Sequence, residues 1–403
     1  MQCDHLEDGY FRYSSRRSWM LLFRTRAVFI VTGLRKLFHM SEFHFLVTIS
    51  LCLFSCNAIA QVDDKTLPDE IKLNQIQVIG THNSYHLAPE PKLLGLIAAT
   101  SQRAAMAIDY SHAPIETQLA EYGIRQLELD VYADPKGGLF ANPIGKSLLA
   151  ATSNDSRMQF EFQAVMSKPG MKIIHSPGFD YATTVPTLVN ALKQIRNWSE
   201  ANPKHVPILI MIELKEDVTG PAGVKPLAFN SDLLNAIDTE IRSVVPATSM
   251  LLPDNVRGEF KTLRAAILER GWPTLADCRG KLLFALDNEG SLADRYLEGH
   301  PILNDRVMFA SVNESHPAAA WMKINDPIRD FEKIQSMVAK GFLVRTRADA
   351  ETKQSRLNDA TQRDKAFASG AQFISTDYPR ADLRFSDYCV QFDNGSMVRI
   401  RSR

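Results

Sequence analysis

The sequence predicts one α/β domain folded as a (β/α)₈ barrel. Beyond about residue 70, short runs of apolar and β-branched residues alternate with longer segments of helical period, which is the pattern of repeated βα units. Eight such runs occur, and eight parallel strands close a barrel of this type. The alternative is an open doubly wound sheet, but no glycine-rich nucleotide loop supports it.

Several of the predicted strands are apolar throughout. The run from Ile208 to Ile212 is an example, and such runs are typical of parallel strands that are covered on both faces. The eight predicted strands span residues 76–80, 124–132, 171–175, 207–215, 281–287, 306–311, 341–345 and 372–376.

Helices are predicted between these strands. The last of them begins after Asn358 and Asp359, which are suited to cap it, and ends at Gly370. Residues 133–170 and 216–226 contain Gly, Pro, Asn and Ser without periodicity, and we expect them to form long loops at the rim of the active site. The predicted helices span residues 185–201, 227–244, 257–270, 328–340 and 360–369.

Composition and charge exclude some classes of partner. The chain has 46 Lys and Arg residues and 46 Asp and Glu residues, so its formal net charge is zero. We therefore expect no nucleic-acid binding, and any contact with a membrane surface should be local and transient. Outside the first 60 residues the cysteines are Cys278 and Cys389, which either form a disulfide or remain separate buried thiols.

The first 60 residues predict export from the cytoplasm. Residues 40–60, from Met40 to Ala60, form an apolar run that ends in Ala58-Ile59-Ala60, the small-x-small pattern of a signal-peptidase site. Residues 1–39 form a basic extension before it. Cleavage after Ala60 leaves residues 61–403 as a single catalytic domain in the periplasm or outside the cell. The alternatives are a lipoprotein attached at Cys56 and a membrane anchor at residues 44–60.

Polar side chains lie at the carboxyl ends of the first four predicted strands. In a parallel barrel these ends meet on one face, where catalytic groups are assembled. Glu128 and Asp130 are two residues apart, so on a strand both point into the barrel mouth. The groups at the four ends are His82 and Asn83, Glu128 and Asp130, His175, and Glu213 and Lys215.

These residue types favour a hard cation and acid–base chemistry. The carboxylate and amide groups offer only oxygen donors, which suit Ca²⁺ or, less well, Mg²⁺, and no Cys/His cluster has zinc spacing. Two histidines beside such a cation form a general acid and base pair, because imidazole titrates near neutral pH. The remaining histidines are interpreted as structural: His86, His112, His205, His300 and His316.

At these residues the chain resembles the Ca²⁺-dependent, phosphoinositide-specific phospholipase C family, in particular its secreted bacterial branch. Thr81-His82-Asn83-Ser84-Tyr85 is similar to the first catalytic motif of that family, and Glu128-Leu129-Asp130 is similar to the second. The resemblance implies the phosphodiesterase type of TIM barrel. It also implies catalytic roles for His82 and His175, with Asn83, Glu128, Asp130 and Glu213 as calcium ligands.

The same resemblance implies a substrate and a mechanism. The substrate is a phospholipid or small phosphodiester of phosphoinositide type, and the product is a cyclic phosphate. His82 lies beside the phosphoryl oxygen, His175 is the acid, and Glu213 or Glu128 is the base. Lys215 and Arg345 are expected to bind the substrate, and Arg347 and Asp377 are weaker candidates for the same site.

Two other functions remain open at this point. A glycerophosphodiester phosphodiesterase uses similar groups without a cyclic intermediate, but it usually carries Arg and Gly after the first histidine, where this chain has Asn83. A barrel that binds a phosphorylated ligand without turnover is the second alternative. Loss of a histidine or a ligand would favour it, and neither is lost here.

Overall fold

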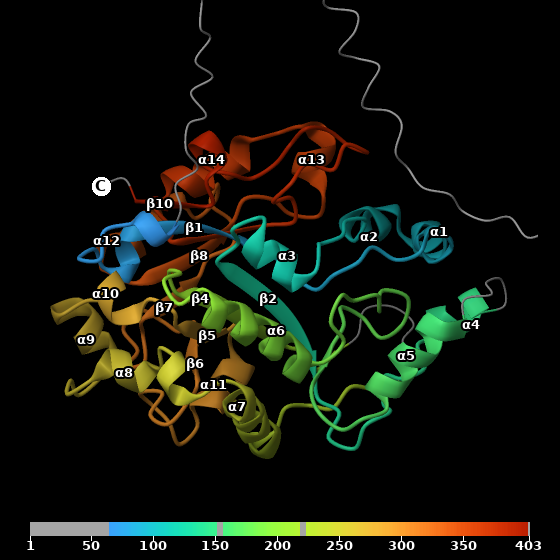
Figure 1. The fold of residues 1–403 in the computed structure, drawn as a ribbon, viewed down its shortest axis with the longest axis horizontal. Coiled ribbons are helices and arrows are strands. Elements are labelled where there is room, and N and C mark those ends of the chain that lie inside the picture. Colours follow the sequence, from blue (N-terminus) through green and yellow to red (C-terminus); the bar gives the residue numbers. More distant parts are fainter. Residues whose placement is uncertain (1–63, 151–155, 218–222, 402–403) are drawn as a thin grey trace, which may run out of the picture. The chain divides into compact units, whose positions relative to one another are not determined.

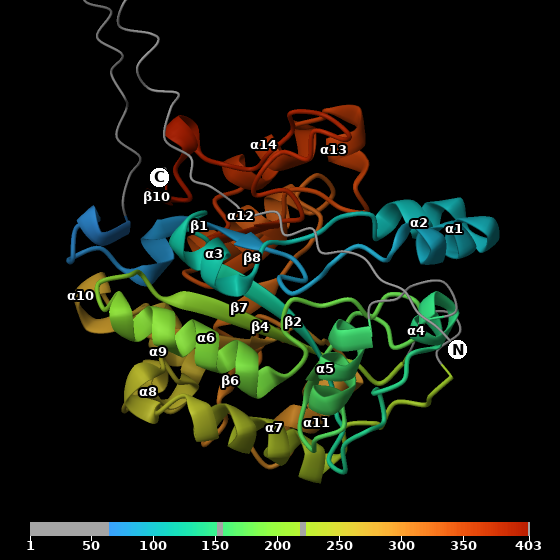
Figure 2. The same cartoon turned by 45° about the vertical axis from the view of Figure 1, so that its right-hand side comes forward.

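The computed structural model describes residues 64–150, 156–217 and 223–401, which belong to one compact unit (Figures 1 and 2). The predicted extension and signal peptide, residues 1–60, lie outside the described residues. Within those three segments, no helix has the length and apolar character needed to cross a membrane.

Eight parallel strands form the barrel and confirm the predicted fold class. Their order around the sheet is β6-β5-β4-β2-β1-β9-β8-β7, and a single parallel bridge between Ser311 and Trp321 joins the two ends. The strands are β1 (Ile76–Thr81), β2 (Gln126–Tyr132), β4 (Ile208–Leu214), β5 (Leu282–Leu286), β6 (Met308–Ala310), β7 (Trp321–Lys323), β8 (Leu343–Arg347) and β9 (Phe373–Thr376).

One predicted barrel strand is wrong, and one was missed. Residues 171–175 contain only the short strand β3 (Lys172–Ile173), which pairs antiparallel with the end of β2. Its apolar residues are buried because they cover β2. The eighth barrel strand is β7, which is too short, at three residues, to give a periodic signal. A further strand, β10 (Val398–Ile400), pairs antiparallel with β1.

The helices follow the predicted order with local differences. The predicted helix at 257–270 is split at Gly258, whose φ of 55° is left-handed, and the predicted loop at 133–170 contains two helices. Around the barrel run α6 (Leu188–Ala201), α7 (Ser231–Val244), α8 (Pro253–Arg257), α9 (Leu263–Glu269), α10 (Leu275–Cys278), α11 (Ser291–Leu297), α12 (Phe331–Ala339), α13 (Lys353–Leu357) and α14 (Thr361–Ala368). The loops after β1 and β2 carry α1 (Pro91–Thr100), α2 (Gln102–Ala107), α3 (Ile115–Ala120), α4 (Ile144–Ala150) and α5 (Ser156–Met166). Short 3₁₀ helices span Asp64–Thr66, Leu73–Gln75, Ala247–Ser249 and Asp393–Gly395.

Side-chain caps fix where several helices begin. The hydroxyl of Thr187 accepts a hydrogen bond from the backbone N–H of Asn190 at the start of α6, and Asn230 does the same for Leu233 at the start of α7. The strands between the helices are fully buried, as Ile208–Ile212 illustrates. Cys278 and Cys389 are free thiols, so the disulfide alternative is excluded. A closed, apolar barrel therefore presents its polar groups at the strand ends.

Candidate active site at the carboxyl ends of the strands

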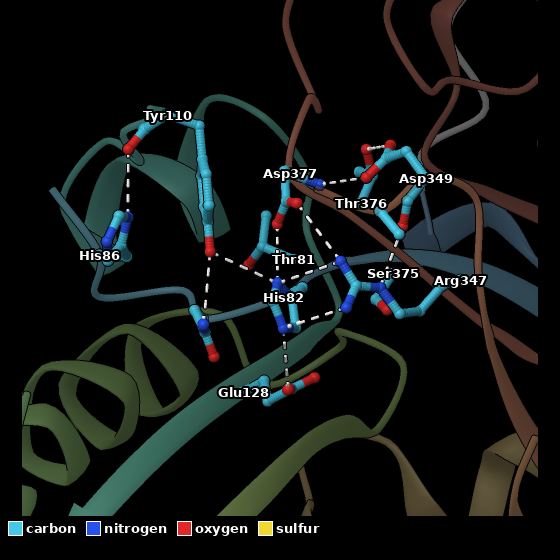
Figure 3. A network of polar contacts seen from close by, with 12 residues as sticks. Thr81, His82, His86, Tyr110, Glu128, Arg347, Asp349, Ser375, Thr376 and Asp377 are labelled. Carbon is cyan, nitrogen blue, oxygen red and sulfur yellow. Dashed lines mark hydrogen bonds and ion pairs between the residues drawn. The ribbon is translucent and has the colours of Figure 1, made fainter. Parts of the chain in front are cut away.

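His82 follows β1 directly and is fixed against the end of β9. Its backbone N–H donates to the carbonyl oxygen of Thr376 at 3.1 Å. Its Nδ1 lies 2.8 Å from Oδ1 of Asp377, the residue that follows β9 (Figure 3). Asp377 is held in turn, because its backbone N–H donates to the buried carboxylate of Asp349 at 2.8 Å. His82 is therefore positioned by two neighbouring strands.

Arg347, at the end of β8, completes this group. Its guanidinium lies 3.3 Å from Oδ2 of Asp377 and 3.3 Å from each ring nitrogen of His82. Burial and the charge of Arg347 lower the pKa of His82 to about 3. Burial opposes ionisation of Asp377, but His82 and Arg347 outweigh it and lower the pKa of Asp377 to about 2. At neutral pH a neutral imidazole thus donates Nδ1–H to a carboxylate, and Nε2 carries a lone pair.

The acidic residues of β2 and β4 meet in the barrel mouth. Glu128 and Asp130 lie on the same side of β2, and Asp130 is paired in register with Glu213 on β4. One carboxylate oxygen from each of the three lies within 4.8 Å of the others. The nearest oxygen of Glu128 is 3.6 Å from Nε2 of His82, so the cluster and the histidine share one site.

Two predicted substrate-binding cations contact this acidic cluster. Nζ of Lys215 lies 3.1 Å from Glu213 and 3.4 Å from Asp130, and Nη2 of Arg345 lies 2.5 Å from Glu128. Both cations are thus engaged by carboxylates in this structure.

The cluster is electrostatically costly as it stands. Burial and the charge of Glu213 raise the pKa of Asp130 to about 8, although Lys215 acts against this. Burial also raises the pKa of Glu128 to about 8, against the opposing charge of Arg345 and with a further contribution from Asp287. These raised pKa values show that burial and mutual repulsion oppose ionisation of the whole cluster.

The donor set fits a calcium ion. The side-chain oxygen of Asn83 and both carboxylate oxygens of Asp130 are buried and have no hydrogen-bond partner at normal distance. Asn83 adopts a left-handed conformation with φ of 45°, and its amide nitrogen donates to the hydroxyl of Tyr110 at 3.3 Å, so its oxygen is the free end. Unpartnered buried oxygens beside Glu128 and Glu213 are suitable ligands for a hard cation.

His175 lies apart from His82 and has its own carboxylate. It follows β3 and not a barrel strand, and its Nδ1 is 2.6 Å from Oδ2 of Asp180. The other oxygen of Asp180 is 2.9 Å from Nε2 of His86, a fully buried side chain. The rings of His86 and His175 stand edge to face, with their centroids 5.5 Å apart. Each predicted catalytic histidine therefore has a carboxylate partner, Asp377 or Asp180.

Sequence reasoning missed several residues of this site. Asp377 and Arg347 follow predicted strands and were ranked low, and their position at strand ends was the available signal. His112, interpreted as structural, donates Nε2–H to the carbonyl oxygen of His82 at 2.8 Å. Tyr110, His112 and Asp180 lie in non-periodic loops, and the sequence gives no signal for them. Asp287 follows β5 and is paired with Lys323 at 2.9 Å.

The TIM barrel thus carries, at the carboxyl ends of its strands, a His–Asp pair beside an acidic group that could hold a metal ion. The family model described as phosphoinositide phospholipase C, Ca²⁺-dependent, matches residues 71–402. The chain belongs to this family, which confirms the resemblance seen in the motifs. Membership implies hydrolase activity on phosphodiesters and dependence on calcium.

Solved structures of the family share the fold. A calcium-dependent phosphoinositol-specific phospholipase C from Pseudomonas sp. in complex with myo-inositol is 15% identical, with a TM-score of 0.51 over 84% of this chain and 100% of the other. Another crystal form of that enzyme, also 15% identical, has a TM-score of 0.50 over 85% of this chain and 100% of the other. A Ca²⁺-dependent enzyme from Streptomyces antibioticus is 16% identical, with a TM-score of 0.46 over 76% and 95%. No curated protein matches the chain in sequence.

Proposed function

We propose that this protein is a Ca²⁺-dependent phospholipase C that cleaves the phosphodiester bond of a phosphoinositide-type lipid. One observation carries the proposal: the His82–Asp377 pair lies against a cluster of three carboxylates, two of them buried, at the barrel mouth. Asn83, Glu128, Asp130 and Glu213 would hold the calcium ion. When bound, Ca²⁺ supplies positive charge that acidifies a coordinated hydroxyl and stabilises charge on the phosphoryl group.

We assign the proton acceptor to His82. Its Nδ1–H is directed at Asp377, so the lone pair is on Nε2. Arg347 would move from its 3.3 Å contact with Nε2 as that atom takes the proton of the attacking hydroxyl, and the carboxylate of Asp377 stabilises the imidazolium that forms. The sequence suggested Glu128 or Glu213 for this role. Glu128 is paired with Arg345 and Glu213 with Lys215, and both glutamates are proposed calcium ligands, whereas Asp377 orients His82 with its lone pair on Nε2.

His175 is assigned to the leaving group. Its Nδ1–H is directed at Asp180, so the acid form of His175 is the imidazolium, which gives its Nε2 proton to the departing lipid oxygen. The attack of a neighbouring hydroxyl forms one P–O bond as the bond to the lipid breaks, and the product is a cyclic phosphate. Lys215 and Arg345 would exchange a carboxylate contact for the substrate phosphate or a ring hydroxyl.

A local apolar surface supports contact with a membrane. Helices α1 and α4 follow β1 and β2 and lie side by side, since Nζ of Lys92 donates to the carbonyl oxygen of Leu148 at 3.2 Å (Figure 2). Leu96 on α1 is 41% exposed and Leu148 on α4 is 39% exposed. These exposed leucines lie in the loops that follow β1 and β2, and we propose that they enter the lipid surface.

A panel of phosphodiesters tests the proposed function. Purified protein is assayed with phosphatidylinositol vesicles, glycerophosphoinositol and glycerophosphocholine, and products are identified by ³¹P NMR. Cleavage of phosphatidylinositol to a cyclic inositol phosphate supports the proposal. Preferred hydrolysis of a glycerophosphodiester without a cyclic product supports the glycerophosphodiesterase alternative, and binding without turnover supports the ligand-binding barrel.

We also propose export and cleavage after Ala60, with residues 61–403 as the catalytic domain. Expression of the whole chain in a bacterial host should yield a processed protein outside the cytoplasm whose amino-terminal residue is Gln61. A chain that begins at Gln61 should be fully active. Retention of the uncut chain in the cytoplasm, or an inactive folded domain, would contradict this.

A further inference from the structure

We infer that His86 is a buried imidazolium whose ion pair with Asp180 positions His175 for proton transfer. This inference rests on the proposed role of His175 in catalysis. His86 follows the first catalytic motif by one residue, and the sequence gave it only a structural role. Its side chain is fully buried, so its protonation state is fixed by its two hydrogen-bond partners.

Both ring nitrogens of His86 face oxygen atoms that accept hydrogen bonds. Nδ1 lies 3.1 Å from the carbonyl oxygen of Tyr110, which has no proton to donate. Nε2 lies 2.9 Å from Oδ1 of Asp180. Burial opposes ionisation of Asp180, but His86 and His175 outweigh it and hold the pKa of Asp180 well below its ordinary range. Because a carbonyl oxygen and an ionised carboxylate only accept hydrogen bonds, we assign a hydrogen to each ring nitrogen, which makes His86 positively charged.

This pair fixes the orientation of the His175 ring. The second oxygen of Asp180 accepts from Nδ1 of His175 at 2.6 Å, which leaves Nε2 as the reacting nitrogen. The hydroxyl of Tyr132 donates to the backbone carbonyl oxygen of His175 at 3.3 Å and does not compete for the ring. The His86–Asp180 pair is the charged group that the described structure places against the ring.

The backbone holds the pair rigidly in place. The N–H of Ser176 donates to the carbonyl oxygen of Asp180 at 2.9 Å, which closes the loop after His175. His86 and Thr183 form an antiparallel bridge that ties this loop to the one after β1. The ring of His86 packs on Tyr110 with a centroid distance of 4.5 Å. His86, in the loop after β1, thus holds the side chain of Asp180. Asp180, in the loop after β3, in turn holds the ring of His175.

The charge on His86 has a further consequence for the acid. A bare buried carboxylate would hold the proton of His175 strongly, which opposes its release to the leaving oxygen. The imidazolium of His86 offsets the charge of Asp180, so the carboxylate orients His175 at a lower electrostatic cost. His86 and Asp180 are therefore positioning residues that act through His175.

Two variants separate charge from geometry. In Asp180→Asn the amide is able to accept from Nδ1–H of His175 and donate to Nε2 of His86, which keeps both hydrogen bonds and removes both charges. In His86→Gln a neutral amide replaces the imidazolium. The matched control is His205→Gln, because His205 is equally buried but is bonded to Ser199 and its own neighbour Val206, away from the site.

The first measurement does not depend on catalysis. ¹⁵N NMR of the histidine side chains in the wild-type protein at neutral pH should show protons on both nitrogens of His86, and Asp180→Asn should remove one of them. A single proton on His86 in the wild type overturns the inference. This readout stands even if His175 proves to have no catalytic role.

The second measurement is a double-mutant cycle with His175→Ala. We expect Asp180→Asn and His86→Gln to lower kcat by about 10–100-fold with little change in KM. In the His175→Ala background neither should lower kcat further, because both act through that ring. His205→Gln should leave kcat near wild type. An equal loss in both backgrounds would show a merely structural role and overturn the inference. A His175→Ala variant with wild-type activity would instead contradict the proposed function.

Discussion

His82 and Asp377 are 295 residues apart in sequence, yet Nδ1 of the imidazole lies 2.8 Å from the carboxylate. The contact forms because β1 and β9 are neighbours in the barrel, with Thr81 paired to Thr376. The barrel thus brings the imidazole at the end of its first strand against the carboxylate at the end of its last strand.

Asp377→Asn should lower kcat by about 10²–10⁴-fold and leave the fold intact. An amide in this place favours the wrong tautomer of His82 and cannot stabilise the imidazolium. Steady-state kinetics on phosphatidylinositol vesicles measure the loss, and the melting temperature is the control for folding. A variant with at least half of the wild-type kcat would remove Asp377 from the mechanism.

The metal-free protein should lose stability as pH rises from about 4 to about 8. Asp130 and Glu128 have a raised pKa of about 8 in the folded state, against about 4 in an unfolded chain, so the folded state binds more protons across this window. The stability that these two carboxyl groups contribute is fully present below about pH 4 and is lost as pH rises through 8. Urea unfolding with excess chelator measures it. Relative to Asp130→Asn, the wild type should become less stable across the window, and a difference that is flat or rises would contradict the raised pKa.

Calcium should stabilise the fold through the same carboxylates. A ligand at about 100 times its Kd adds about 2.7 kcal/mol to the free energy of unfolding, which raises the melting temperature visibly. Asp130→Asn should reduce this gain, because it removes the charge of a buried carboxylate whose oxygens make no hydrogen bond and are available to the ion. Scanning calorimetry in saturating Ca²⁺ and in excess chelator measures both proteins. Equal melting temperatures for the wild type in the two conditions would exclude the calcium site.

Leu96 and Leu148 should affect the rate only on substrates that lie in a lipid surface. The double variant Leu96→Asp and Leu148→Asp should lower the rate on phosphatidylinositol vesicles about tenfold or more, because charged residues do not enter the lipid. Its rate on a soluble, monomeric phosphodiester should stay near wild type. Leu268→Asp is the matched control, since Leu268 is 42% exposed but lies on α9. Equal losses on both substrates would place the leucines in folding and not in membrane contact.

The sequence predicted the parts of the site that local patterns encode. Alternation on β2 placed Glu128 and Asp130 on one side, and the strand ends marked His82 and Glu213. Asp180 and Tyr110 lie in loops whose course is set by contacts distant in sequence, so no period identifies them. His175 was found for a wrong reason: it follows β3, an antiparallel strand that covers β2, and not a barrel strand. A buried antiparallel strand such as β3 and a buried barrel strand both have an apolar sequence, so the sequence pattern does not distinguish the two.

Turnover of phosphatidylinositol vesicles with and without calcium tests the central claim most directly. The wild-type domain is assayed in saturating Ca²⁺, in excess chelator, and again after Ca²⁺ is restored, with the product followed by ³¹P NMR. We predict release of a cyclic inositol phosphate in Ca²⁺, loss of nearly all activity in chelator, and full recovery on readdition. The same rate in chelator as in Ca²⁺ would contradict a mechanism in which Asn83, Glu128, Asp130 and Glu213 hold the catalytic cation.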